Sequence, residues 1–181
     1  MTNREKHSGP AIAFQWWSEL TAERAGRRRA ALARMRRAAT PIEVMFEPEA
    51  LGLIQRLPRN PDRVAALAGI LACVRSDDSR LVARAVGRDS LDNDQPPAIM
   101  SEARFRRILQ TSPDGLMDAM RRLVAMTKGQ VNVRDLSAAV LYWGERVKRD
   151  WMFQYYNVSL AAPDGQGAAP KSPTQSSESE Q

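Results

Sequence analysis

The stretch from residue 136 to residue 156 constrains the fold more than any other part of this 181-residue chain. Apolar side chains recur in it at steps of four, three, four and four residues, at Leu136, Val140, Trp143, Val147 and Trp151. Residues at this spacing share one face of an α-helix, so the stretch predicts one long helix with a buried face that Tyr155 extends. Burying two tryptophans and several aliphatic side chains stabilises a fold by roughly 1.5–3 kcal/mol each. We therefore expect this helix to organise a helical core.

The rest of the chain shows the same periodicity near 3.6, and no stretch has the alternating pattern of a strand. Helix start signals are frequent, at Thr40-Pro41, Asn60-Pro61, Ser101, Ser112-Pro113 and Asn132. The sequence therefore predicts an all-α helical bundle, either as one body or as two small helical lobes. Residues 162–181 contain no aromatic or branched aliphatic side chain. We expect a mobile N-terminus at 1–10, a helical domain at 11–160 and a disordered tail at 161–181.

The residues needed for most kinds of catalysis are missing from the sequence. Cys73 and His7 are its only cysteine and histidine, which excludes a disulfide, a zinc site and a Cys-His or Ser-His pair. No glycine-rich phosphate loop is present, and the acids around 77–94 lack the spacing of a calcium loop. We expect a protein that is not an enzyme and uses no cofactor or metal. The unpaired cysteine and the lack of a signal peptide or apolar span favour the cytoplasm.

The balance of charge points to an anionic partner. The formal net charge is +6, the sequence pI is about 10.1, and arginine far outnumbers lysine. The segment from Thr21 to Ala39 is the most basic, with seven arginines against the single acid Glu23. Like charges crowded on one helix repel each other, and a polyanion relieves that repulsion. A phosphate-binding face is therefore favoured over an idle solvated surface, although net charge alone does not decide between them.

The arginines that could grip a phosphate backbone fall on four predicted helices. The candidate nucleic-acid-binding residues are Arg36, Arg37, Arg104, Arg107, Arg121, Arg122, Arg146, Lys148 and Arg149. If the helices align these faces, they form a track for a phosphate backbone that reads no bases. Base readers usually also carry Asn or Gln on a recognition helix, and Gln110 is a lone candidate here.

A set of short motifs in a fixed order resembles one known family. The motifs are RRAATPIEV (36–44), LP (57–58), MSEARFRRIL (100–109), MRRL (120–123) and LYWGER (141–146), the last followed by a tryptophan and further aromatics. Together they resemble the CasB family, the small subunit of the type I-E CRISPR-Cas complex Cascade. The resemblance runs from about Phe14 to Tyr156.

The resemblance implies an all-helical, non-catalytic subunit that is present in two copies beside the guide RNA. It implies contacts with the large and backbone subunits, and a role in holding the target strand and the displaced non-target DNA strand. The family's nucleic-acid-binding arginines look similar to Arg37, Arg104, Arg122 and Arg146. Glu145 stands where relatives can show a base, which puts one contact in doubt, and Lys148 or Arg149 is its candidate substitute. Four such arginines predict a salt slope of about 3 on a single strand.

Two other functions are compatible with the residues themselves. A free-standing helical regulator would use 101–127 as a helix-turn-helix and would bind one DNA sequence, whereas a backbone clamp would not. An interaction protein would use the basic face to bind acidic protein partners, and nucleic acid would compete with them.

Overall fold

The computed structural model describes residues 8–22, 26–89 and 97–158. The main helices are α2 (Gly9–Ala22), α3 (Gly26–Arg37), α4 (Pro41–Val44), α5 (Pro48–Arg56), α6 (Pro61–Leu71), α7 (Val82–Val86), α8 (Glu102–Leu109), α9 (Leu116–Met126), α10 (Val133–Leu141) and α11 (Glu145–Tyr155). A 3-10 turn, η1 (Pro113–Gly115), precedes α9, and two short strands are β1 (Ser76–Asp77) and β2 (Gln130–Val131). The predicted all-α fold is confirmed. The expectation that no strand forms is wrong at this one short pair.

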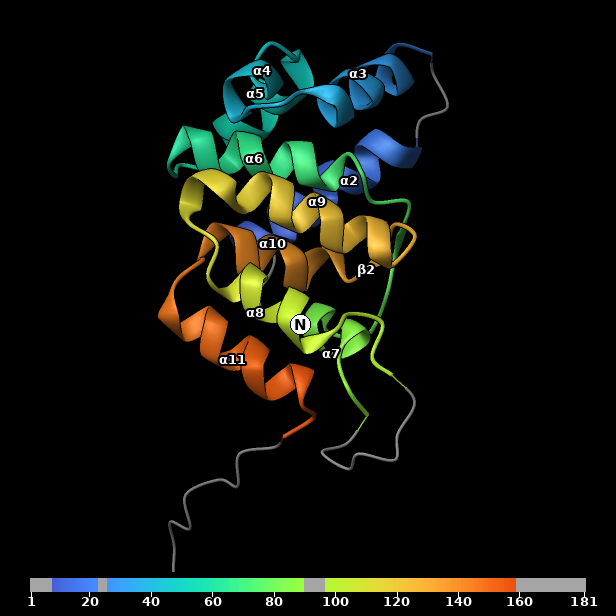
Figure 1. Cartoon of the computed structure of the whole chain (residues 1–181). Coiled ribbons are helices and arrows are strands. Elements are labelled where there is room, and N and C mark those ends of the chain that lie inside the picture. Colours follow the sequence, from blue (N-terminus) through green and yellow to red (C-terminus); the bar gives the residue numbers. More distant parts are fainter. Residues whose placement is uncertain (1–7, 23–25, 90–96, 159–181) are drawn as a thin grey trace, which may run out of the picture.

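The helices are stacked in layers between two smaller groups, as Figure 1 shows. Helix α6 is central, because it packs against α4 and α5 on one side and against α9 and α10 on another. Helix α2 packs along α10, which gives the most extensive contact between two helices. In Figure 1, α3, α4 and α5 lie at one end of the molecule and α7, α8 and α11 at the other. One apolar core cluster runs through both ends, from Trp16 to Tyr155.

Several helices begin where the sequence places a cap. The side chains of Thr40, Asn60 and Asn132 each accept a hydrogen bond from the backbone N–H three residues later, at 3.2, 3.0 and 2.9 Å. These bonds satisfy N–H groups that have no partner inside the helix. Ser101 and Ser112 occupy the N-cap positions of α8 and η1, where the sequence predicts helix starts, but their side chains make no capping hydrogen bond.

The stretch from 136 to 156 forms two helices and not the single long helix that its apolar spacing predicts. Helix α10 ends at Leu141 and α11 begins at Glu145. Gly144, which has low helix propensity, adopts an extended backbone between them. The expected burial still holds for Trp143 and Trp151, whose rings meet edge to face at 5.4 Å between centroids. The apolar spacing continues across the break because α10 and α11 both bury their apolar faces in the same core.

Two aspartates tie the short strands to the helices beside them. The strands pair in parallel, with Ser76 opposite Gln130. The Asp77 carboxylate accepts the N–H of Val133 at the start of α10, at 2.8 Å. The Asp135 carboxylate in α10 accepts the N–H of Val82 at the start of α7, at 2.7 Å. A carboxylate at a helix N-terminus also interacts favourably with the helix dipole.

Three expectations from the sequence concern the ends of the chain and its apolar runs. Helix α2 begins at Gly9, two residues before the predicted domain. The described residues omit 1–7, which is most of the predicted mobile N-terminus at 1–10, and 159–181, which includes all of the predicted disordered tail at 161–181. Among the described residues, no helix combines the length and the apolar character needed to cross a membrane.

Candidate nucleic-acid interface

Three of the predicted arginines meet in a groove between α8 and α9. This α8–α9 groove has a volume of about 380 Å³, and Arg104, Arg107 and Arg122 line it together with Met100, Ile108 and Met126. Arg104 and Arg107 lie one turn apart on α8, and Arg122 reaches the groove from α9. All three side chains are exposed. Two helices therefore present three cations over an apolar floor.

The three groove arginines have no anionic partner within the part of the chain that the structure describes, 8–22, 26–89 and 97–158. No hydrogen bond or ion pair holds their guanidinium groups there. Arg106, their neighbour on α8, instead pairs with Glu102 at 2.6 Å. Because no carboxylate of the described residues lines the groove, its positive charge is available to an anion from outside.

Arg121 has a different role from Arg122, although the two are adjacent in the sequence. Its Nη1, Nη2 and Nε groups donate to the backbone carbonyls of Ala38 at 2.6 Å, Met35 at 2.6 Å and Gly69 at 3.2 Å. A Cβ on Gly69 would lie 2.8 Å from Nη2, so the glycine makes room for the guanidinium. The carbonyls lie at the C-terminal ends of α3 and α6, where a cation is favourable. Arg121 therefore joins three helices, whereas Arg122, the other member of the predicted doublet, lines the α8–α9 groove.

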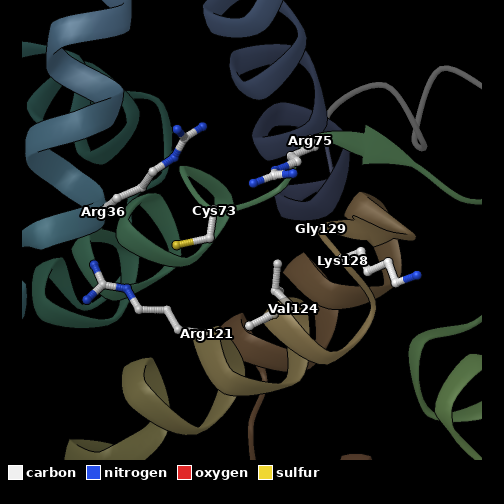
Figure 2. Close-up of a pocket in the computed structure, with 8 residues that line it drawn as sticks. Arg36, Cys73, Arg75, Arg121, Val124, Lys128 and Gly129 are labelled. Carbon is white, nitrogen blue, oxygen red and sulfur yellow. The ribbon is translucent and has the colours of Figure 1, made fainter. Parts of the chain in front are cut away.

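Arg36 lies in a second cavity, the basic pocket, on a different face of α9 from the α8–α9 groove. The basic pocket has a volume of about 470 Å³ and is lined by Arg36, Arg75, Arg121 and Lys128 around Cys73. Figure 2 shows these side chains arriving from α3, from the segment after α6 and from α9 with the loop that follows it. The Nε group of Arg36 donates to the carbonyl of Ala72 at the end of α6.

The basic segment of α3 is partly neutralised within the molecule. Arg34 forms a two-pronged pair with Glu47, at 2.6 and 2.7 Å, and Glu47 is buried. Arg28 donates to the Glu19 carbonyl at 2.8 Å. Arg37, at the end of α3, is exposed. Arg37 is not among the residues that line the groove or the basic pocket.

The cations of α11 form a third group. Lys148 pairs with Glu145 at 3.0 Å. Arg146 lines a cavity between α10 and α11 together with Asp135 and Asp150, and no ion pair joins it to either aspartate within the described residues. Arg149 is exposed. The nine predicted residues therefore divide among the groove, the basic pocket, the end of α3 and α11.

Sequence reasoning missed two cations that the fold brings to the basic pocket. Arg75 follows α6 and Lys128 follows α9, and neither belongs to an arginine cluster in the sequence. The pairing of β1 with β2 brings them together, and the Arg75 N–H donates to the Gly129 carbonyl at 2.8 Å. Gly129 has a φ of +84°, in the left-handed region that glycine adopts readily at the end of a helix.

The described residues contain no group of three or more histidine, cysteine, aspartate or glutamate side chains that could hold a metal ion. The fold and the groove together define a helical protein with a polar, cationic surface suited to phosphate groups.

Comparison with protein families identifies the chain more closely. Residues 28–156 match the family model of CRISPR-associated protein Cse2, and the chain belongs to this family. A search of curated proteins finds no match.

Two solved structures have a similar fold. One is a chain of E. coli Cascade bound to a PAM-containing dsDNA target, with a TM-score of 0.60, 18% identity, and coverage of 80% of this chain and 96% of that chain. The other is CasB from Thermus thermophilus, with a TM-score of 0.58, 20% identity, and coverage of 87% of this chain and 100% of that chain. At this identity the similarity establishes the shared fold.

Proposed function

We propose that this chain is a non-catalytic small subunit of a type I-E CRISPR surveillance complex and that it holds nucleic-acid backbone in the α8–α9 groove. One observation carries the proposal: Arg104, Arg107 and Arg122 converge there, and none of the described residues that line the groove is a carboxylate. Arginine forks suit phosphate oxygens, and contacts of this kind position a strand without reading its sequence. Membership of the Cse2 family supports the proposal that the chain is a subunit of such a complex, as does the fold shared with a chain of a DNA-bound Cascade.

The proposed contribution to the complex is to stabilise the opened duplex. Exchanging a DNA duplex for a guide–target duplex is nearly balanced in free energy, so a few backbone contacts shift it. Guide RNA, target strand and displaced strand all present the same phosphate chemistry to the groove. The large and backbone subunits and a second copy of this chain are the proposed protein partners. Arg37 and Arg149, both exposed, remain proposed additional contacts.

The competing proposal, a sequence-specific regulator, is less well supported by the geometry. A recognition helix must present several polar side chains on one free face. The exposed stripe of α9 consists of Asp118, Arg122 and Ala125, and its only cation follows an acid by one turn. Helix α9 also packs against α6 and α8. Footprinting on random DNA separates the two proposals, because a regulator protects one sequence and a clamp protects none.

The direct experiment changes the groove in the assembled complex. The variant Arg104→Gln/Arg107→Gln/Arg122→Gln should shorten the lifetime of the opened DNA without changing the helicity of the chain. The matched control is Arg56→Gln/Arg80→Gln/Arg106→Gln, which removes the same charge from arginines paired with Glu19, Asp78 and Glu102. An equal effect of both variants would show that net charge, and not the groove, holds the DNA.

A further inference from the structure

The basic pocket is lined by basic residues that do not line the α8–α9 groove. Four of its lining side chains are basic, Arg36, Arg75, Arg121 and Lys128, and none of the described residues that line it is acidic. Its volume of about 470 Å³ exceeds that of the α8–α9 groove. Concentrated positive charge without a carboxylate costs free energy unless it is solvated or neutralised by an anion.

The donors in the pocket divide into those already bonded and those available. Arg121 donates from all three of its nitrogen groups to backbone carbonyls, so it contributes fixed charge. Arg36 is anchored through Nε, and its two terminal nitrogens have no hydrogen bond to the described residues. The guanidinium of Arg75 also has no hydrogen bond to the described residues. Arg36 and Arg75 therefore supply the free donors.

The orientation of the side chains places those free donors beside the same space. In Figure 2 the guanidinium of Arg75 points back across the pocket toward the side of Arg36 and Cys73. The ammonium of Lys128 points away, so only its stem forms part of the wall in this conformation. Arg36 is held at the end of α6, and the Cα of Arg75 is held by the pairing of β1 with β2. The fold thus fixes the Nε group of Arg36 and the backbone of Arg75, and it brings the two side chains to the same pocket.

We propose that the basic pocket binds a phosphate group, with Arg36 and Arg75 as its ligands and Arg121 as a fixed neighbouring charge. Charge-assisted bonds from two guanidinium forks suit a tetrahedral anion, and an oxyanion meets no acid among the described lining residues. The phosphate can be a free phosphate or pyrophosphate, or a phosphodiester of nucleic acid. The site goes beyond the α8–α9 groove and does not depend on it, because Arg121 and Arg122 face different cavities.

Cys73 provides a reporter for this pocket. It is the only cysteine in the chain, lines the pocket, and its Sγ donates to the Gly69 carbonyl at 3.6 Å. Burial raises the pKa of its thiol, and Arg121 and Arg36 oppose that shift. Alkylation by neutral iodoacetamide at alkaline pH therefore measures access to the pocket. A bound phosphate should slow this reaction.

The test measures how pyrophosphate and a short single-stranded oligonucleotide each slow alkylation of Cys73 in the full chain. Calorimetric titration with pyrophosphate gives the same comparison without the thiol. Arg75→Gln should weaken protection about tenfold, since it removes a charge-assisted contact, and Arg75→Lys should restore part of it. Arg107→Gln, which removes the same charge from the groove, is the matched control and should leave protection unchanged.

The outcomes distinguish the source of the phosphate and separate this site from the proposed function. Protection by pyrophosphate indicates a free anion, and protection by the oligonucleotide alone indicates a nucleic-acid backbone. The triple groove variant should keep either protection. The proposal is overturned if neither probe protects Cys73 or binds in the calorimeter. It is also overturned if the probes protect the Arg75→Gln variant as well as the parent, or if Arg107→Gln weakens protection as much as Arg75→Gln does.

Discussion

Two adjacent arginines, Arg121 and Arg122, show how the function of a residue depends on what surrounds it. Arg121 is half-buried and bonded to carbonyls of α3 and α6, whereas Arg122 is exposed beside the α8–α9 groove. The first stabilises the fold, and the second is available to a ligand.

Arg121→Met should lower the free energy of unfolding by about 3 kcal/mol, because it leaves helix-terminal carbonyls without their charged donor. The matched variant Arg122→Met should change stability by less than about 0.5 kcal/mol. Urea denaturation of both variants measures the difference. Equal stability of the two would contradict the structural role assigned to Arg121.

Asp135 makes the stability of the fold depend on pH. Burial raises the pKa of its carboxyl, and the Val82 N–H that it accepts opposes this shift. The folded state therefore retains this proton to a higher pH than the unfolded state. The contribution of the protonated Asp135 carboxyl to folding stability is fully present below the pKa of the group in the unfolded state, about 3.9. It is lost as pH rises through the higher pKa of the folded state.

Asp135→Asn keeps an oxygen acceptor for Val82 and removes the buried charge. The variant should therefore gain stability relative to the parent as pH rises from about 3 toward neutrality, since only the parent must ionise a buried group. Denaturation at a series of pH values checks this. A constant difference between the two proteins across that range would show that the carboxylate is not destabilised by burial.

At the scale of elements, α11 closes the far end of the molecule against α7 and α8. The Tyr155 hydroxyl donates to the Met100 carbonyl at 2.7 Å, and its ring stacks on Phe105 with 4.1 Å between centroids. Gly87, just after α7, approaches the backbone of α11 so closely that a Cβ would lie 2.3 Å from the Tyr155 carbonyl oxygen. The φ of Gly87 is −85°, which any residue can adopt, so the requirement for glycine is steric.

Gly87→Ala should destabilise the fold by about 1–3 kcal/mol through this clash, because neither backbone can move without disturbing the packing of α11. Gly52→Ala is the control, since a Cβ there meets nothing within 4 Å and α5 is helical at this position. It should gain roughly 0.5–1 kcal/mol from the better helix propensity of alanine. Opposite shifts of the two urea midpoints are expected. A stable Gly87→Ala variant would show that α7 and α11 can separate cheaply.

At the scale of the whole molecule, the arrangement of the helices decides how many cations act together. The family resemblance implies four contacts, from Arg37, Arg104, Arg122 and Arg146. The structure places Arg104 and Arg122 in the α8–α9 groove, where Arg107 joins them, and places Arg146 in a separate cavity with Asp135 and Asp150. Each phosphate neutralised on a single strand contributes about 0.7 to the salt slope. The groove therefore predicts a slope of about 2, below the value of about 3 expected from four contacts.

Binding of single-stranded oligonucleotides by the isolated chain, followed across a salt series, measures this slope. The value should not depend on base sequence, because the contacts are to phosphates, and it should fall by about 2 in the triple groove variant. The basic pocket adds about 0.7 if the same strand reaches it. If the salt slope were the same in the triple groove variant as in the parent, another surface would be the binding site.

The sequence by itself determined the helical class, most helix starts and the apolar faces, because these depend on interactions within one or two turns. Thr40 and Asn60 cap helices through bonds to residues only three positions away. The sequence does not predict the break between α10 and α11, because the apolar spacing continues across it. It does not predict the two strands either, because two residues are too few to show an alternating pattern.

Only the tertiary structure decided which arginines are free to bind. The partners of Arg121 lie 52, 83 and 86 residues away in sequence, and Arg36 meets a carbonyl 36 residues away. The sequence also gives no sign that Arg75 and Lys128 share a cavity with them. A guanidinium binds an external phosphate only where no internal acceptor already occupies it, and those acceptors are set by packing between distant helices.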